Sequence, residues 1–253
     1  MGRGSDEAWR RWGETEPYYG VLAADRFRLS AIAAHRDEFW DSGEAQVEER
    51  LATAERHFGG FARGRALDFG CGVGRLTLPM ARRFGEAVGL DIAPAMLAEA
   101  QRNADAAGLA NVRWLLSDDG LGAANGRFDL VMSCIVLQHI PVRRGLGIVR
   151  HLLDRVAPAG VAALHVCIGR GDSPAQALRY AAQRHVPGVH RYLNRRAGRP
   201  ADEPLMEMNA YPLDAILAQA QRLGFGPSLV QPVAHGRFLT AQILMRRERM
   251  PAE

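Results

Sequence analysis

A glycine-rich turn constrains the fold of this 253-residue chain more than any other feature. Residues 66–74 read ALDFGCGVG, an apolar stretch that runs directly into three alternating glycines. Glycines let the backbone turn tightly, and they let a ligand approach backbone N–H groups that no Cβ shields. We expect a strand over 65–69 and a helix over 75–84, an order typical of α/β proteins that hold a nucleotide-like cofactor.

The spacing of the glycines bears on which cofactor such a turn holds. Gly70, Gly72 and Gly74 form a G-x-G-x-G pattern, whereas the dinucleotide fingerprint G-x-G-x-x-G would need a glycine where Arg75 stands. Asp68 lies two residues before the first glycine, where its carboxylate disfavours a phosphate but suits an ammonium group. S-adenosylmethionine (SAM) carries an ammonium and a sulfonium and no phosphate, so the pattern favours SAM over a nicotinamide dinucleotide.

Acidic residues follow the next two expected strands. The strand over 86–90 ends at Asp91, about 20 residues past the turn, where a carboxylate can accept hydrogen bonds from both ribose hydroxyls. The strand over 111–116 is followed by Asp118 and Asp119, where an acid can accept from the adenine amino group. Further strands are expected over 128–135, 161–168, 227–233 and 238–245.

Four stretches in this order, LDFGCGVG, GLDIAPAML, the Asp118–Asp119 pair and FDLVMSCIVLQHIP, make the chain resemble the class I SAM-dependent methyltransferase superfamily. The resemblance runs from about residue 45 to about residue 168 and resumes more weakly near the C-terminus. It implies a Rossmann-like, doubly wound α/β fold with a seven-stranded mixed sheet whose last strand is antiparallel. It also implies that SAM lies across the carboxyl ends of the strands and that the chain transfers a methyl group, leaving S-adenosylhomocysteine.

The resemblance implies roles for individual residues. It assigns to the cofactor Asp68 and Gly70 at the methionine amino group, Gly72 and Gly74 along the turn, Asp91 at the ribose, Asp118 and Asp119 at the adenine amino group, Ile92 and Met96 at the adenine ring, and Ser133 near the methionine moiety. Arg75 is expected either to meet the methionine carboxylate or to be an exposed helix residue.

A hydroxyl acceptor would need a general base, and His139 is the candidate. It follows the fourth strand in LQHIP, and histidine has an ordinary pKa near neutrality. The alternative is that His139 is a hydrogen-bonded structural post in its loop. An amine or carboxylate acceptor would need no base. Residues 133–136, at the end of the fourth expected strand, read SCIV. A D/N-P-P-Y/F motif is missing there, which argues against the exocyclic-amine methylases of DNA and RNA.

Residues 1–43 are expected to form an N-terminal helical cap, and residues 44–253 the methyltransferase domain. The cap is rich in aromatic residues. We expect at least one of Tyr18, Tyr19 and Trp40 to line the substrate site. The alternative is that these rings only fasten the cap onto the domain.

An insertion over 169–210 follows the fifth strand, and we expect it to form a lid over the substrate. No acid lies between Asp172 and Asp202, and the arginines there suit an anionic or polyhydroxylated substrate. The residues expected to contact the substrate are Arg179, Arg184 and Arg191. Alternatively, the insertion is a solvated basic surface that packs or forms a subunit contact, as in a homodimer, or one that binds RNA.

The net charge of +4 is weak support for a nucleic-acid partner, because all 32 basic residues are arginine, which we attribute to codon bias. No apolar run approaches the roughly 18 residues of a membrane span, and the first 14 residues lack the apolar core of a signal peptide. Three cysteines fit no metal-site spacing. We therefore expect a cytoplasmic protein with reduced thiols and no metal.

These observations favour an enzyme that methylates a small molecule or a glycan intermediate, preferably at oxygen. Two alternatives remain at this point: an RNA methyltransferase that uses the arginine-rich insertion, and a SAM-binding protein without catalytic activity. The acceptor itself is not readable from the sequence, since its pocket is built from the cap and the insertion, where the resemblance is weakest.

Overall fold

The computed structural model describes residues 3–235 and 237–248. Its centre is a seven-stranded sheet in the order β3-β2-β1-β4-β5-β7-β6. The strands are β1 (Arg65–Phe69), β2 (Glu86–Asp91), β3 (Val112–Leu116), β4 (Phe128–Ser133), β5 (Val156–Arg170), β6 (Phe225–His235) and β7 (Phe238–Arg247). β7 runs antiparallel to both of its neighbours, while the pairs from β3 to β5 are parallel. The expected mixed sheet with its reversed last strand is confirmed.

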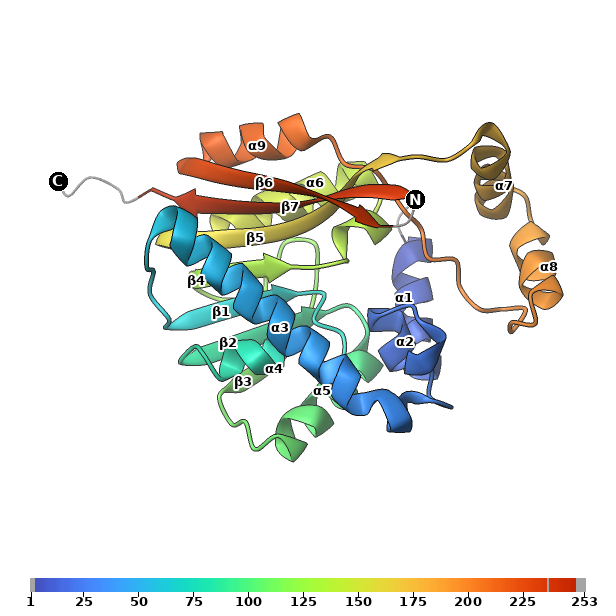
Figure 1. Cartoon of the computed structure of the whole chain (residues 1–253), viewed down its shortest axis with the longest axis horizontal. Coiled ribbons are helices and arrows are strands. Elements are labelled where there is room, and N and C mark those ends of the chain that lie inside the picture. The colour runs from blue at the N-terminus through green and yellow to red at the C-terminus, as the bar shows by residue number, and fades with distance from the viewer. Residues whose placement is uncertain (1–2, 236, 249–253) are drawn as a thin grey trace.

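Helices cover both faces of this sheet (Figure 1). On one face lie α3 (Ile32–Phe58), α4 (Thr77–Ala81) and α5 (Pro94–Ala106), and on the other lie α6 (Val142–Asp154) and α9 (Leu213–Arg222). Because the central parallel strands are covered on both faces, their residues are almost all apolar. Each face packs one core cluster, the larger beneath α6 and α9 and the smaller beneath α3 and α4. The chain is therefore doubly wound, as the sequence indicates.

The helix after the glycine turn is shorter than the sequence predicts. We expect 75–84, but α4 spans only Thr77–Ala81. Gly72 and Gly74 have φ angles of +52° and +91°, so the non-helical turn continues beyond them before the helix begins. Pro79 has no N–H group and cannot donate the bond that would extend the helix backwards.

The expected boundary between cap and domain at residue 43 lies inside a helix. α3 continues through it from Ile32 to Phe58. Gly43 is a contact point rather than a break, because a Cβ there would lie 2.3 Å from the carbonyl oxygen of Arg75. Before α3, the cap consists of α1 (Arg3–Thr15), α2 (Pro17–Val21) and the 3₁₀ helix η1 (Asp25–Phe27).

The insertion after β5 forms two helices that stand away from the sheet (Figure 1). They are α7 (Pro174–His185) and α8 (Val189–Arg196). A capping box begins α7, in which the Ser173 side chain accepts from the backbone N–H of Gln176 and the Gln176 side chain accepts in return from the N–H of Ser173. No helix in the described ranges is long and apolar enough to cross a membrane.

Candidate active site

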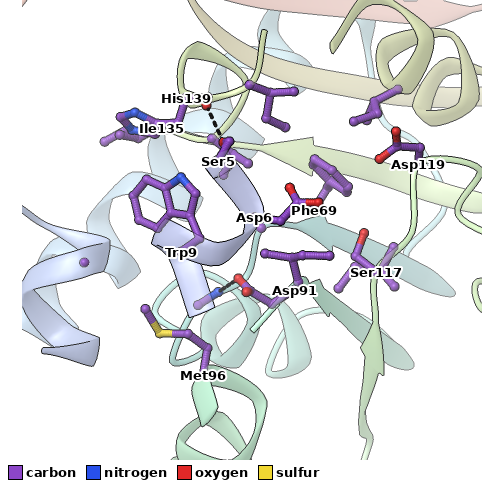
Figure 2. Close-up of a pocket in the computed structure, with 18 of the residues that line it drawn as sticks. Ser5, Asp6, Trp9, Phe69, Asp91, Met96, Ser117, Asp119, Ile135 and His139 are labelled. Atoms are coloured by element: carbon purple, nitrogen blue, oxygen red, sulfur yellow. Dashed lines mark hydrogen bonds between the residues drawn. The ribbon is translucent and has the colours of Figure 1, made fainter. Parts of the chain in front are cut away.

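A cavity opens where the parallel strands end, between the glycine turn and the cap (Figure 2). The empty space in it, with its open mouth included, is about 820 Å³. Its lining comes from the loops after β1, β2, β3 and β4, from α1 and α2, and from the start of α6. The lining residues are Ser5, Asp6, Trp9, Gly20, Val21, Phe69, Gly70, Gly72, Leu90, Asp91, Ile92, Met96, Ser117, Asp118, Asp119, Cys134, Ile135, Val136, His139, Ile140, Arg144 and Ile148.

Two glycines of the turn line the cavity, and both positions require glycine. Gly70 and Gly72 have φ angles of +74° and +52°, a region that residues with a Cβ rarely adopt. Space is restricted as well: a Cβ on Gly70 would lie 2.3 Å from Val136 Cγ2, and one on Gly72 would lie 2.5 Å from Val21 Cγ2. The turn is therefore shaped both by its own backbone and by the loop and helix that pack on it.

Asp91 at the end of β2 ties the turn to the next loop. Its Oδ2 accepts from the N–H of Gly72 and its Oδ1 from the N–H of Ala93, each at 2.9 Å. Burial raises the pKa of Asp91, and these backbone hydrogen bonds act against that rise. A carboxylate has about four acceptor sites, so acceptor capacity remains for a ligand. Because Asp91 also lines the cavity, its free acceptor sites suit the paired hydroxyls of a ribose.

The other cofactor residues that reach the cavity come from the β2 and β3 ends. Ile92 and Met96 line it with apolar surface, as expected for a planar ring. Asp118 Oδ1 accepts from the N–H of Gly122 at 2.9 Å. Asp119 accepts hydrogen bonds from Arg144, among them one from Nε at 2.8 Å and one from Nη2 at 2.7 Å. Some of the hydrogen-bond acceptor sites of Asp118 and Asp119 are thus occupied within the protein.

Asp68, which is expected to hold the methionine amino group directly or through water, is not among the residues that line the cavity. Side chains alternate along a strand, so Phe69 faces the cavity while Asp68 faces the helices on the opposite side of the sheet. There Thr77 donates to Asp68 Oδ2 at 2.7 Å. Burial raises the pKa of Asp68 to about 6, against the opposing effects of Thr77 and Arg75. Asp68 stabilises the strand–helix junction beneath the turn.

Gly74, Arg75 and Ser133 also lie outside the cavity lining. A Cβ on Gly74 would lie 2.9 Å from the indole of Trp114, so this glycine makes room for a core side chain. Arg75 is neither a lining residue nor exposed: it is buried, and its Nη2 donates to Gln46 on α3 at 2.6 Å. Ser133 is fully buried at the end of β4, and the next residue along the chain reaches the cavity instead.

His139 lines the cavity from the 3₁₀ helix η2 (Leu137–His139), and its tautomer follows from its contacts. Nδ1 lies 2.6 Å from the carbonyl oxygen of Glu207. A carbonyl only accepts, so Nδ1 carries the proton and Nε2 keeps a lone pair. Burial lowers the pKa of His139 to about 4, so the ring is neutral at physiological pH. The ring also packs against Trp9 at 4.8 Å.

Helix α1 contributes three lining residues that the sequence did not single out as site residues, namely Ser5, Asp6 and Trp9 (Figure 2). Ser5 Oγ donates to the carbonyl of His139 at 3.0 Å. Asp6 pairs with Arg144, whose Nη1 lies 2.6 Å from Oδ1. The only sequence signal for them is the expected helical cap over residues 1–43, with its aromatic residues. No local pattern shows which distant loop such a helix contacts.

Comparison with known proteins agrees with this geometry. The family model described as "Methyltransferase domain" matches residues 66–160, the stretch from the glycine turn to the start of β5. Residues 66–160 are thus similar to methyltransferase domains. The match includes the glycine turn, Asp91 and His139, and excludes the cap and the insertion.

Curated relatives support this family and share only part of their length with the chain. A ubiquinone biosynthesis O-methyltransferase of Cereibacter sphaeroides is 41% identical over 76 residues, 30% of this chain and 31% of the relative. The same enzyme of Acinetobacter baylyi is 33% identical over 128 residues, 47% of this chain and 54% of the relative. The matches thus span about a third to a half of these relatives.

The likeness to solved structures concerns the fold and extends further. The magnesium protoporphyrin IX methyltransferase of Synechocystis PCC 6803, crystallised with S-adenosylhomocysteine, superposes with a TM-score of 0.64 at 16% identity. The superposition covers 96% of this chain and 100% of that chain. The fold therefore includes elements on both sides of the methyltransferase domain that the family model leaves out.

The cap aromatics expected in the substrate site instead fasten the cap onto the methyltransferase domain. Tyr18 Oη donates to Glu99 on α5 at 2.6 Å, and burial raises its pKa to about 12. Trp40 packs edge-on against Tyr18 at 6.4 Å. Tyr19 is buried beneath the guanidinium of Arg28 at 3.9 Å. None of these three side chains lines the described cavity.

The lid arginines also lie outside the described cavity lining. Arg179 and Arg191 are exposed. Arg184 pairs with Glu207 at 3.0 Å and so holds the segment that returns from the insertion. The charged lining residues are Asp6, Asp91, Asp118, Asp119 and Arg144. Four of these five residues are acids, and the arginines of the insertion are not among them.

Proposed function

We propose that the chain is a SAM-dependent methyltransferase that methylates a hydroxyl group of a small, uncharged and largely apolar molecule. One observation carries the proposal. A single cavity is lined by Gly70, Gly72 and Asp91 on one side and by His139 and Trp9 on the other. Groups suited to a nucleoside and a group suited to a hydroxyl proton therefore face the same space.

The cavity fits SAM at the positions that the structure shows. The turn at Gly70 and Gly72 has no side chain that would fill the floor, and Asp91 has acceptor sites left for ribose hydroxyls. Ile92 and Met96 supply apolar surface for the adenine. When bound, SAM supplies a methyl group that its sulfonium already activates, so the protein has to align the acceptor and exclude water.

His139 supplies the proton acceptor in this proposal. Its Nδ1–H is held by the Glu207 carbonyl, so Nε2 is the nitrogen that can take the proton of an acceptor hydroxyl. With a pKa of about 4 the ring is a weak base, yet it stays unprotonated at neutral pH and is always available. General-base catalysis of this kind contributes roughly 10²- to 10⁴-fold to a rate.

The lining favours an apolar acceptor without negative charge. Trp9, Val136 and Ile140 give it apolar surface, and most of its charged groups are acids. The relatives named as ubiquinone biosynthesis O-methyltransferases support oxygen as the acceptor atom. We place the protein in the cytoplasm, which the three free cysteines support, since thiols stay reduced there.

Two measurements on the whole chain test the proposal. Calorimetry with SAM, S-adenosylhomocysteine and NAD should show binding of the first two alone. Transfer of a labelled methyl group should then be followed with phenols, carboxylic acids, amines and single-stranded RNA. Methylation of a phenolic hydroxyl is the expected result. NAD binding without SAM binding would overturn the cofactor assignment, turnover only with RNA the acceptor assignment, and SAM binding without turnover the enzymatic role.

A further inference from the structure

The two helices of the insertion are anchored along one side. On α7, the Tyr180 hydroxyl accepts from the backbone N–H of Met208 at 2.8 Å. On α8, Asn194 Nδ2 donates to the carbonyl of Glu203 at 2.9 Å. Both partners belong to the segment that returns from the insertion to α9. The inner sides of α7 and α8 therefore face this return segment.

The opposite side of both helices carries large apolar side chains in contact with water. In a helix, residues two positions apart point about 200° apart, so Leu178 faces away from Tyr180 and Tyr192 away from Asn194. Leu178 is 73% exposed and Tyr192 60% exposed, and Val186 between the helices is 50% exposed. Such side chains gathered on a projecting element are typical of an interaction surface.

The same two helices carry an unbalanced positive charge. Between residues 173 and 201 there are six arginines and no acid. Arg184 pairs with Glu207 and Arg199 with Glu203, both in the return segment. Of these six arginines, the four that form no ion pair within the described part of the chain are Arg179, Arg191, Arg195 and Arg196, and all four are exposed.

We propose that this outer surface, the lid face (Leu178, Val186, Tyr192, Arg179, Arg191, Arg195 and Arg196), docks on an anionic lipid bilayer. Helices that combine exposed apolar residues with arginines lie in the interface of such membranes, with the apolar side chains among the headgroups and the arginines near lipid phosphates. RNA would use the charge but would leave Leu178 and Val186 in water. The lid face projects from the carboxyl edge of the sheet, free of the core helices (Figure 1).

Vesicle co-sedimentation of the whole chain tests the proposal and does not depend on methyl transfer. Binding is expected with phosphatidylcholine vesicles that contain phosphatidylglycerol, not with phosphatidylcholine alone, and should weaken as salt is added. Each arginine near an anionic surface contributes roughly fivefold, so R191A/R195A/R196A should bind about 100-fold more weakly. L178A/Y192A should lose roughly tenfold, because less apolar area is buried. Alanine preserves the helices, which circular dichroism checks.

The matched control is R56A/R143A/R150A, which removes the same charge from exposed positions on α3 and α6. It should lose less than about twofold if the lid face is the site. A control that loses as much as the lid variant would overturn the proposal, as would equal binding to both kinds of vesicle. Binding of single-stranded RNA without vesicle binding, lost in the arginine variant and kept in L178A/Y192A, would assign the surface to nucleic acid instead.

Discussion

The two sides of the cavity are held together in different ways. The strand side, formed by Gly70, Gly72, Asp91 and the Asp118–Asp119 pair, is joined by bonds between neighbouring loops. Gly72 and Asp91, for example, are 19 residues apart. The cover, formed by Ser5, Asp6 and Trp9 of α1 and by Val21, is joined to the rest across 134 residues at Ser5–His139 and 138 at Asp6–Arg144.

This difference indicates which part of the cavity determines cofactor affinity and which part determines turnover. Bonds on the strand side involve backbone N–H groups, whose positions follow from the strand–turn–helix geometry that the motif itself dictates. Bonds of the cover join side chains to distant partners, so they depend on how the whole chain packs. The strand side should therefore determine cofactor affinity, and His139 with the cover should determine turnover.

The largest expected effect is that of changing His139, and it is an effect on turnover. His139→Ala should lower kcat by roughly 10²- to 10⁴-fold with SAM affinity unchanged, because a general base is lost. Glu207→Ala is the matched control, since it keeps the backbone carbonyl that holds Nδ1, and it should cost less than about threefold. If His139→Ala lowers the melting temperature but keeps kcat, the residue is a structural post.

The pKa of His139 gives a second expectation, measured as stability against pH. A folded-state pKa of about 4 lies below the ordinary 6.5, so the unfolded chain binds a proton over this interval and the folded chain does not. As pH falls from 6.5 to 4, wild type should lose up to about 3 kcal/mol of unfolding free energy relative to His139→Gln. Asp68, with its pKa raised to about 6, acts in the opposite direction in both proteins and cancels in this comparison.

Urea unfolding of the two proteins at several pH values measures this difference. The kcat/KM of wild type should likewise fall only below about pH 4 to 5 rather than near 6.5, since Nε2 must be unprotonated. A stability difference that does not change with pH would contradict the buried, neutral ring.

On the strand side, Asp91→Ala should weaken SAM binding by about 1–3 kcal/mol, because charge-assisted hydrogen bonds to the ribose are lost. Calorimetric titration measures the change. Asp91→Asn, which keeps one acceptor oxygen, should lose less than the alanine variant. Unchanged affinity in Asp91→Ala would show that the ribose lies elsewhere.

Arg144 joins the two sides, since it pairs with Asp6 on the cover and Asp119 on the strand side. Arg144→Ala should weaken S-adenosylhomocysteine binding by about 1–2 kcal/mol, less than full burial would imply because these groups are partly exposed. The affinities of Asp6→Ala and Asp119→Ala show how much of this loss comes from the pair on the cover and how much from the pair on the strand side. Equal affinity in all three variants would mean that the cover does not help to retain the cofactor.

The smallest effect is expected where the cover meets the insertion at the surface. Arg11 pairs with Asp202, and their side chains are 46% and 56% exposed. Exposed ion pairs contribute little, so Arg11→Ala and Asp202→Ala should each change the unfolding free energy by less than about 1 kcal/mol and kcat by less than twofold. A larger loss of kcat would show that the cover and insertion move together during turnover.

Prediction from sequence was most accurate where local patterns dictate structure. The seven-stranded mixed sheet and its reversed last strand follow the expected pattern, and Gly70, Gly72 and Asp91 line the cavity. It was less accurate where side chains choose between two environments. Asp68 faces away because of strand alternation, and Tyr18 is taken up by α5, although both residue types were compatible with a ligand.

The amino-acid sequence by itself determined the strand–turn–helix unit and the acid at the end of the next strand, because local backbone conformation depends on residues close together in the chain. Only the tertiary structure decided that α1 covers the cavity, that Glu207 sets the tautomer of His139, and that Arg179 and Arg191 are exposed. These depend on contacts between residues far apart in sequence, whose partners are chosen by packing and charge in the folded molecule.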